Sequence, residues 1–190
     1  MFFFDKSGSI PVAAKTIEAA YLSILNGDLV IAQKSFLAID SPRAMWGVTL
    51  CDILKGQVNT FPTYFGIRNF LEIDLDFLLK NEKIDYVEQV LGSADFLSTI
   101  NQEVYKYIAR VMLENNFYNA ALKYLEKSKT ILYRDPELHY LLAKYYFLHK
   151  DYQNADYYIN ECANILPDYY PAQLFKESLQ NIWREKEYLV

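Results

Sequence analysis

The 190-residue sequence predicts an all-α protein, a short right-handed α-solenoid of antiparallel helix pairs that ends in a capping helix. The first observation is that apolar residues recur at three- and four-residue steps along most of the chain, as they do on one face of an α-helix. The second is a repeat of about 34 residues, which is visible when the chain is shifted against itself. The third is that Gly and Pro number only six each, which disfavours a fold built from strands and tight turns.

Three consecutive blocks carry this repeat, and each consists of two amphipathic segments joined by a short polar turn. The blocks are 68–101, 102–135 and 136–169, and their turns have the sequences NEK, ENN and HKD. The first block is degenerate, because Asp74 interrupts its apolar pattern. Small residues, mostly alanines, recur within the segments, and they let two helices approach closely while larger neighbours fill the grooves beside them.

Degenerate repeats are expected before these blocks, over about residues 13–67. Residues 18–39 predict two helices around an Asn-Gly-Asp turn, and Ser41-Pro42 predicts the N-cap and first residue of a helix that continues to about Lys55. The next helix is expected over 63–80. That segment is too long for the first helix of an ordinary repeat, so a break or an irregular repeat is predicted there.

The C-terminal end is expected to be a capping helix over about 171–187, beginning at Pro171. Apolar residues recur along one face of this segment, and the other face is polar. A terminal helix of a solenoid has a neighbour on one side only, so it needs such a polar outer face. The whole chain, 1–190, is therefore interpreted as a single domain.

The third block resembles the tetratricopeptide repeat, whose pattern is W-x2-L-G-x2-Y, then A-x3-F, then P. In this block HYLLAKYY is followed by ADYYI and by Pro167, with His139 and Ala143 in place of Trp and Gly. The second block has YKYIARVM and ALKYL, and Tyr133 replaces its proline. In that family the first helix of each repeat lines a concave groove. The resemblance therefore implies a non-enzymatic scaffold or adaptor that binds a partner peptide or helix in this groove.

Composition narrows the class of function. The formal net charge of −5 lacks the basic footprint of a nucleic-acid-binding protein. No apolar run approaches the ~18 residues that span a bilayer, and the start MFFFDKSGSI has no basic region of a signal peptide. The two cysteines, Cys51 and Cys162, lack metal-ligand spacing and fit a reducing compartment. We expect a cytoplasmic protein with no nucleic-acid partner and no membrane insertion.

Motifs of catalysis and cofactor binding are missing from the sequence. It contains neither a glycine pattern for phosphate binding nor HExxH or G-x-S-x-G. His139 occupies a packing position and His149 a turn, and both cysteines lie on apolar helix faces. Glu72, Asp74 and Asp76 form a short acidic cluster. On a helix Glu72 and Asp76 share a face, which we interpret as a solvated acidic face, while Asp74 points elsewhere. We expect no catalytic residue, no metal site and no cofactor.

The family resemblance also implies which side chains face the groove. It places Lys106, Arg110 and Lys144 in a basic strip, with Tyr140 and Phe147 beside it. Glu72 and Asp76 would form an acidic edge. Such a surface would bind an extended peptide that carries an acidic group and an apolar side chain.

The Lys106-x3-Arg110 pair resembles half of the carboxylate clamp with which some family members bind chaperone C-termini. The asparagines of the other half are missing, because Glu72 and Asp76 occupy the corresponding positions. The simpler interpretation of Lys106 is a weak, solvated ion pair with Glu103, three residues before it.

Two other functions stay open. One is a chaperone for a secreted or assembled partner, since bacterial secretion chaperones are similar in size and carry three such repeats. The other is self-assembly into a homo-oligomer, through the Phe-rich start of the chain or through the irregular stretch 56–67. An enzyme on a helical-repeat scaffold is the least favoured class, because no converging set of polar residues is found.

Overall fold

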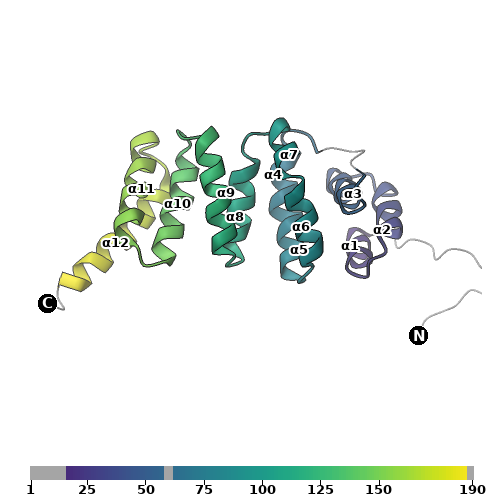
Figure 1. Ribbon diagram of the computed structural model, residues 1–190, viewed down its shortest axis with the longest axis horizontal. Coiled ribbons are helices and arrows are strands. Elements are labelled where there is room, and N and C mark those ends of the chain that lie inside the picture. Colours follow the sequence, from purple (N-terminus) through teal and green to yellow (C-terminus); the bar gives the residue numbers. More distant parts are fainter. Residues whose placement is uncertain (1–15, 58–61, 188–190) are drawn as a thin grey trace, which may run out of the picture. The chain divides into compact units, whose positions relative to one another are not determined.

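A computed structural model describes residues 16–57 and 62–187, with side chains as far as Asn181. Within these ranges the chain is helical and contains no strand, which confirms the all-α prediction (Figure 1). The chain divides into two compact units, Met1–Ser93 and Ala94–Val190. No helix in the described part of the chain is long and apolar enough to cross a membrane. The predicted role of the Phe-rich start in self-assembly falls on residues outside the described ranges.

The first unit begins with three helices that pack on one another. They are α1 (Ile17–Leu25), α2 (Leu29–Leu37) and α3 (Pro42–Leu54). The Ser41 side chain accepts a hydrogen bond from the backbone N–H of Ala44, which fixes the start of α3. The predicted N-cap and the predicted extent of this helix are confirmed.

The unit continues with α4 (Gly66–Phe70), η1 (Leu71–Leu75) and α5 (Asp76–Lys80), which follow one another without a gap. The middle element is a turn of π-helix, in which one extra residue is accommodated per turn. The helix predicted over 63–80 begins at Gly66 and is continuous, and it contains a π turn where a break or an irregular repeat was expected. The next helix, α6 (Ile84–Gly92), packs on α5 and on α3.

Six helices make up most of the described part of the second unit. They are α7 (Ala94–Ile100), α8 (Val104–Glu114), α9 (Tyr118–Ile131), α10 (Pro136–Leu148), α11 (Tyr152–Ile165) and α12 (Tyr170–Glu187). The closest packing is between α8 and α9 and between α10 and α11, and α12 packs on α11. The helix predicted over about 171–187 corresponds to α12. The repeat pattern does not predict the short α7.

The same backbone turn ends α5, α8 and α10. Its central residues, Glu82, Asn116 and Lys150, stand 34 residues apart and have φ values of 56°, 65° and 60°. In each turn the N–H of this residue donates to the carbonyl three residues earlier, and the following N–H donates to the carbonyl five residues before itself. This pair of bonds is the Schellman C-cap of a helix. The turns NEK, ENN and HKD are thus confirmed, and they share one geometry.

The small residues of the repeat lie in the core of the second unit. Ala109, Ala121, Ala143 and Ala155 are all fully buried, as is Cys162 in the equivalent small-residue position. Ala143, Ala155 and Cys162 belong to one core cluster, in which larger side chains pack around them, including Ile159 and the half-buried Tyr140 and Phe147.

Candidate functional site

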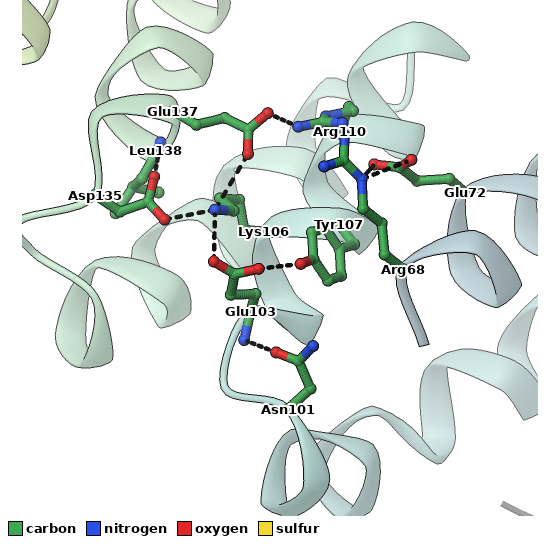
Figure 2. Close-up of polar contacts among 10 residues, drawn as sticks. All are labelled: Arg68, Glu72, Asn101, Glu103, Lys106, Tyr107, Arg110, Asp135, Glu137 and Leu138. Atoms are coloured by element: carbon green, nitrogen blue, oxygen red, sulfur yellow. Dashed lines mark hydrogen bonds and ion pairs between the residues drawn. The ribbon is translucent and has the colours of Figure 1, made fainter. Parts of the chain in front are cut away.

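Lys106 lies in the middle of α8, and its ammonium group is enclosed by carboxylates rather than exposed (Figure 2). Its Nζ is 3.2 Å from Glu103 Oε1, 2.5 Å from Asp135 Oδ2 and 3.1 Å from Glu137 Oε2. Only 4% of the side chain is exposed. The predicted pair with Glu103 is present, but Lys106 is enclosed instead of forming part of an exposed basic strip, and the pair is not solvated at Lys106.

The neighbours of Lys106 are held by further bonds. Arg110 pairs with the second oxygen of Glu137. Asp135 also accepts a hydrogen bond from the backbone N–H of Leu138 at 3.0 Å, so it caps the N-terminus of α10. Glu103 accepts a hydrogen bond from the Tyr107 hydroxyl. We call the residues that carry charge here the Lys106 cluster: Glu103, Lys106, Arg110, Asp135 and Glu137.

Both cations of the Lys106 cluster are already paired with carboxylates of the chain. Two cations face three carboxylates, so its formal charge is −1. An additional carboxylate from a ligand would meet this negative surplus instead of a free basic strip. The cluster joins the middle of α8 to the first turn of α10 through ion pairs that are largely shielded from water.

Three of the predicted groove residues share one face of α10, as their spacing of four and three residues requires. Tyr140, Lys144 and Phe147 are all half-buried, and we call them the α10 face. The Lys144 Nζ lies 5.8 Å from the centre of the Tyr140 ring, within the range of a cation–π contact. Lys144 makes no ion pair with any residue that the structure describes.

The aromatic side chains of the α10 face pack against Phe175 of α12. The ring centre of Phe175 is 6.0 Å from that of Tyr140 and 5.2 Å from that of Phe147. Tyr140 also meets Tyr169 edge-on at 5.7 Å. Burial raises the pKa of Tyr140 above its ordinary value, so its hydroxyl remains protonated. The α10 face therefore offers aromatic surface beside one ammonium group that pairs with no carboxylate among the described residues.

Glu72 and Asp76, the predicted acidic edge, belong to the first compact unit. Glu72 accepts hydrogen bonds from Arg68 at 3.1 and 3.2 Å, and Asp76 accepts one from Lys80 at 2.6 Å. Both cations come from the same continuous helix, four residues away in each case. Both carboxylates are partly exposed, as interpreted from the sequence, but neither is unpaired.

Asp74 points away from the partly exposed face of Glu72 and Asp76, as its position on the helix predicted, and it is not solvated. Its side chain is completely buried, and Tyr21 donates a hydrogen bond to it at 2.5 Å. Both guanidinium Nη atoms of Arg43 donate to its two oxygens at 3.0 Å. Burial raises the pKa of this carboxyl, and the hydrogen bonds and charge of Arg43 act against that shift. Burial and the neighbouring carboxylate raise the pKa of Tyr21, so it stays a donor.

The signal for this buried carboxylate was present in the sequence. Asp74 stands 34 residues before Ile108 and 68 before Leu142, and both of these are fully buried apolar residues of the repeat. A polar residue at a core position needs a partner in the core, because an unpaired buried charge is strongly unfavourable. The partners, Tyr21 and Arg43, come from helices far away in the sequence, and no local pattern indicates them.

The remaining reactive side chains pack as expected. Cys51 and Cys162 are fully buried, and burial raises their thiol pKa values to about 12 and about 11. His139 is buried with Nε2 2.6 Å from the carbonyl oxygen of Tyr133, whereas His149 is exposed at the end of α10. Among the described residues, no three His, Cys, Asp or Glu side chains gather as a metal site would require.

The chain matches no protein-family model, and no curated protein is significantly similar to it in sequence. The resemblance to tetratricopeptide repeats therefore stays a prediction that depends on the 34-residue pattern of the chain itself.

Proposed function

We propose that this protein is a non-enzymatic scaffold or adaptor of the tetratricopeptide class, which binds a peptide or helix of another protein in the cytoplasm. The observation that carries the proposal is the recurrence of one helix–turn–helix geometry at an interval of 34 residues, centred on Glu82, Asn116 and Lys150. A helix pair with this period is typical of arrays in which each pair stacks on the next and the stack presents an extended binding surface.

The binding surface that we propose is smaller than the one implied by the family resemblance. The Lys106 cluster is internally paired, so Lys106 and Arg110 have a structural role between α8 and α10. The α10 face is left as the binding surface of the second unit. Its half-buried rings suit an apolar or aromatic side chain of the partner, and Lys144 suits a carboxylate next to that side chain.

The test is affinity capture from a lysate of the source organism with Lys144→Glu and with a matched control, Lys123→Glu. Lys123 is exposed on α9, so the control makes the same change of charge away from the α10 face. Both variants should keep the helical circular-dichroism melt of the wild type. A partner that wild type and control retain, and that Lys144→Glu loses, supports the proposal. A partner retained equally by all three proteins rules out the α10 face.

Self-association is a second candidate, favoured by one exposed side chain. Phe65 is 83% exposed, and its ring lies 5.3 Å from that of Tyr64, which is also exposed. Both belong to the stretch 56–67 that we proposed as a contact between copies. If they form such a contact, light scattering shows a mass that rises with concentration for the wild type and stays monomeric for Phe65→Ser. A constant monomer mass for the wild type excludes this candidate.

A further inference from the structure

The helix that runs from Gly66 through the π turn to Lys80 buries its residues in two rows with a period of four. One row consists of Ile67, Leu71, Leu75 and Leu79, and the other of Gly66, Phe70, Asp74 and Leu78. In a regular α-helix, positions twelve residues apart differ by about 120° around the axis, because each residue turns about 100°. The π turn Leu71–Leu75 underwinds the helix, and the two rows thereby stay on one face.

The first of these two rows is nearly self-similar when it is displaced by one turn, whereas the second row is not, because it contains Gly66, Phe70 and Asp74. The row of Ile67, Leu71, Leu75 and Leu79 presents an aliphatic side chain at every fourth position, so apolar packing on this row is much the same after a shift of four residues. Apolar contacts are non-directional, and they discriminate poorly between two such registers. A unique docking of this helix therefore depends on residues of the second row, which differ from their equivalents one turn away.

Asp74 is the one charged residue in the two rows. Its carboxylate receives three hydrogen bonds, one from Tyr21 on α1 and two from Arg43 on α3. The Arg43 guanidinium in turn lies 4.7 Å from the ring centre of Tyr21 and 5.5 Å from that of Trp46. These bonds are directional, and a displacement of one turn would break all of them at once and leave a buried charge without a partner.

We infer that Asp74, with Arg43 and Tyr21, is a register lock, which makes α1 and α3 dock at one position along the helix Gly66–Lys80. Two contacts identify that position, one on each side of Asp74 along the helix. The Tyr21 ring lies 4.8 Å from that of Phe77. Gly66 lies so close to the indole of Trp46 that an added Cβ would be 3.1 Å from its Nε1. The function of this buried ion pair is then uniqueness of structure, and its contribution to stability is secondary.

The test replaces the lock with apolar side chains of similar size in the full chain, as Tyr21→Phe/Arg43→Met/Asp74→Leu. A matched control removes an exposed ion pair from the same helix, as Arg68→Met/Glu72→Gln. Backbone amide spectra by NMR count the docked states, and contacts between the Trp46 indole and residues of the helix identify the register. Thermal melts of all three proteins check that they are folded.

We expect the triple variant to stay folded, with a melting temperature equal to or above that of the wild type. Its residues in α1 and α3 should show a second set of resonances at roughly a tenth of the intensity, with the Trp46 contacts moved by one turn. The control should show one set. A single, unchanged register in the triple variant would overturn the inference, because packing at Gly66 would then suffice. An unfolded triple variant would overturn it too, because the ion pair would then act through stability.

Discussion

The contact between Gly47 and Phe36 provides a stability prediction with a definite sign. Gly47 lies inside α3, and a Cβ at this position would be 2.5 to 2.6 Å from three atoms of the Phe36 ring. Non-bonded carbons need about 3.5–4.0 Å. Phe36 is fully buried, and its ring packs edge-on against Tyr21 with centres 5.0 Å apart, so it has no open space to move into.

We therefore expect Gly47→Ala to destabilise the protein. Overpacking of a buried site costs about 1–3 kcal/mol, and the better helix propensity of Ala offsets about 0.5–1 kcal/mol of this. The expected net loss in the free energy of unfolding lies between about 0 and 2.5 kcal/mol, and the three short contacts place it in the upper half of that range. Urea denaturation, followed by the helical circular-dichroism signal, measures it. The double variant Phe36→Leu/Gly47→Ala should recover part of the loss, because Leu lacks the ring atoms that clash.

The matched control is Gly92→Ala, at the end of α6. Nothing lies within 4 Å of a Cβ added there, so only the propensity gain should remain and the variant should be as stable as the wild type or slightly more. Opposite signs for the two Gly→Ala changes support the reasoning. A Gly47→Ala variant at least as stable as the wild type would refute it, because Phe36 would then have room that the structure does not show.

Three further outcomes are expected. Replacing Lys150, which has a φ of 60°, with Gly should raise the free energy of unfolding by about 0.5–1 kcal/mol in a urea titration, whereas Lys150→Ala should not, since Ala keeps the strain. Lys106→Met should lower the free energy of unfolding by about 3–5 kcal/mol in the same assay, because three carboxylates lose a buried cation. A decrease as small as that caused by Lys144→Met would contradict the enclosure of Lys106. With thiol pKa values of about 12 and about 11, Cys51 and Cys162 should be almost entirely protonated at pH 8 and should react with a thiol reagent only after unfolding. Rapid labelling of the folded protein would disprove their burial.

Those parts of the fold that depend on local patterns could be predicted from the sequence. Ser41-Pro42 starts a helix wherever it lies, because the hydroxyl and the proline act on the adjacent backbone. The turns around Glu82, Asn116 and Lys150 follow from the 34-residue interval. The π turn was predicted only as an irregularity. A more specific signal exists, namely the four-residue spacing of Ile67, Leu71, Leu75 and Leu79, which exceeds the 3.6 residues of an α-helical turn.

The electrostatics of the candidate site could be predicted only in part. Tyr140, Lys144 and Phe147 share a face because of their spacing along one helix, and this holds. The burial of Lys106 depends on Asp135 and Glu137, which lie about 30 residues away at the start of another helix. The family resemblance predicts toward which face the Lys106 side chain points, but it does not predict the carboxylates with which Lys106 pairs. Charges that meet across two helices depend on tertiary packing, and a single sequence does not encode that packing locally.

The repeated turn has a consequence for how the length of this chain could change. Phe117 and Asp151, the residues that leave two successive turns, have φ and ψ of −84° and 62° and of −86° and 75°. The backbone therefore enters α9 and α11 in nearly the same way. A duplication or deletion of 117–150 would therefore join ends whose backbone geometry at the turn already matches. An insertion of another length within these helices would move the residues that follow it out of the 34-residue register, so a change by a whole helix pair preserves the turn geometry best.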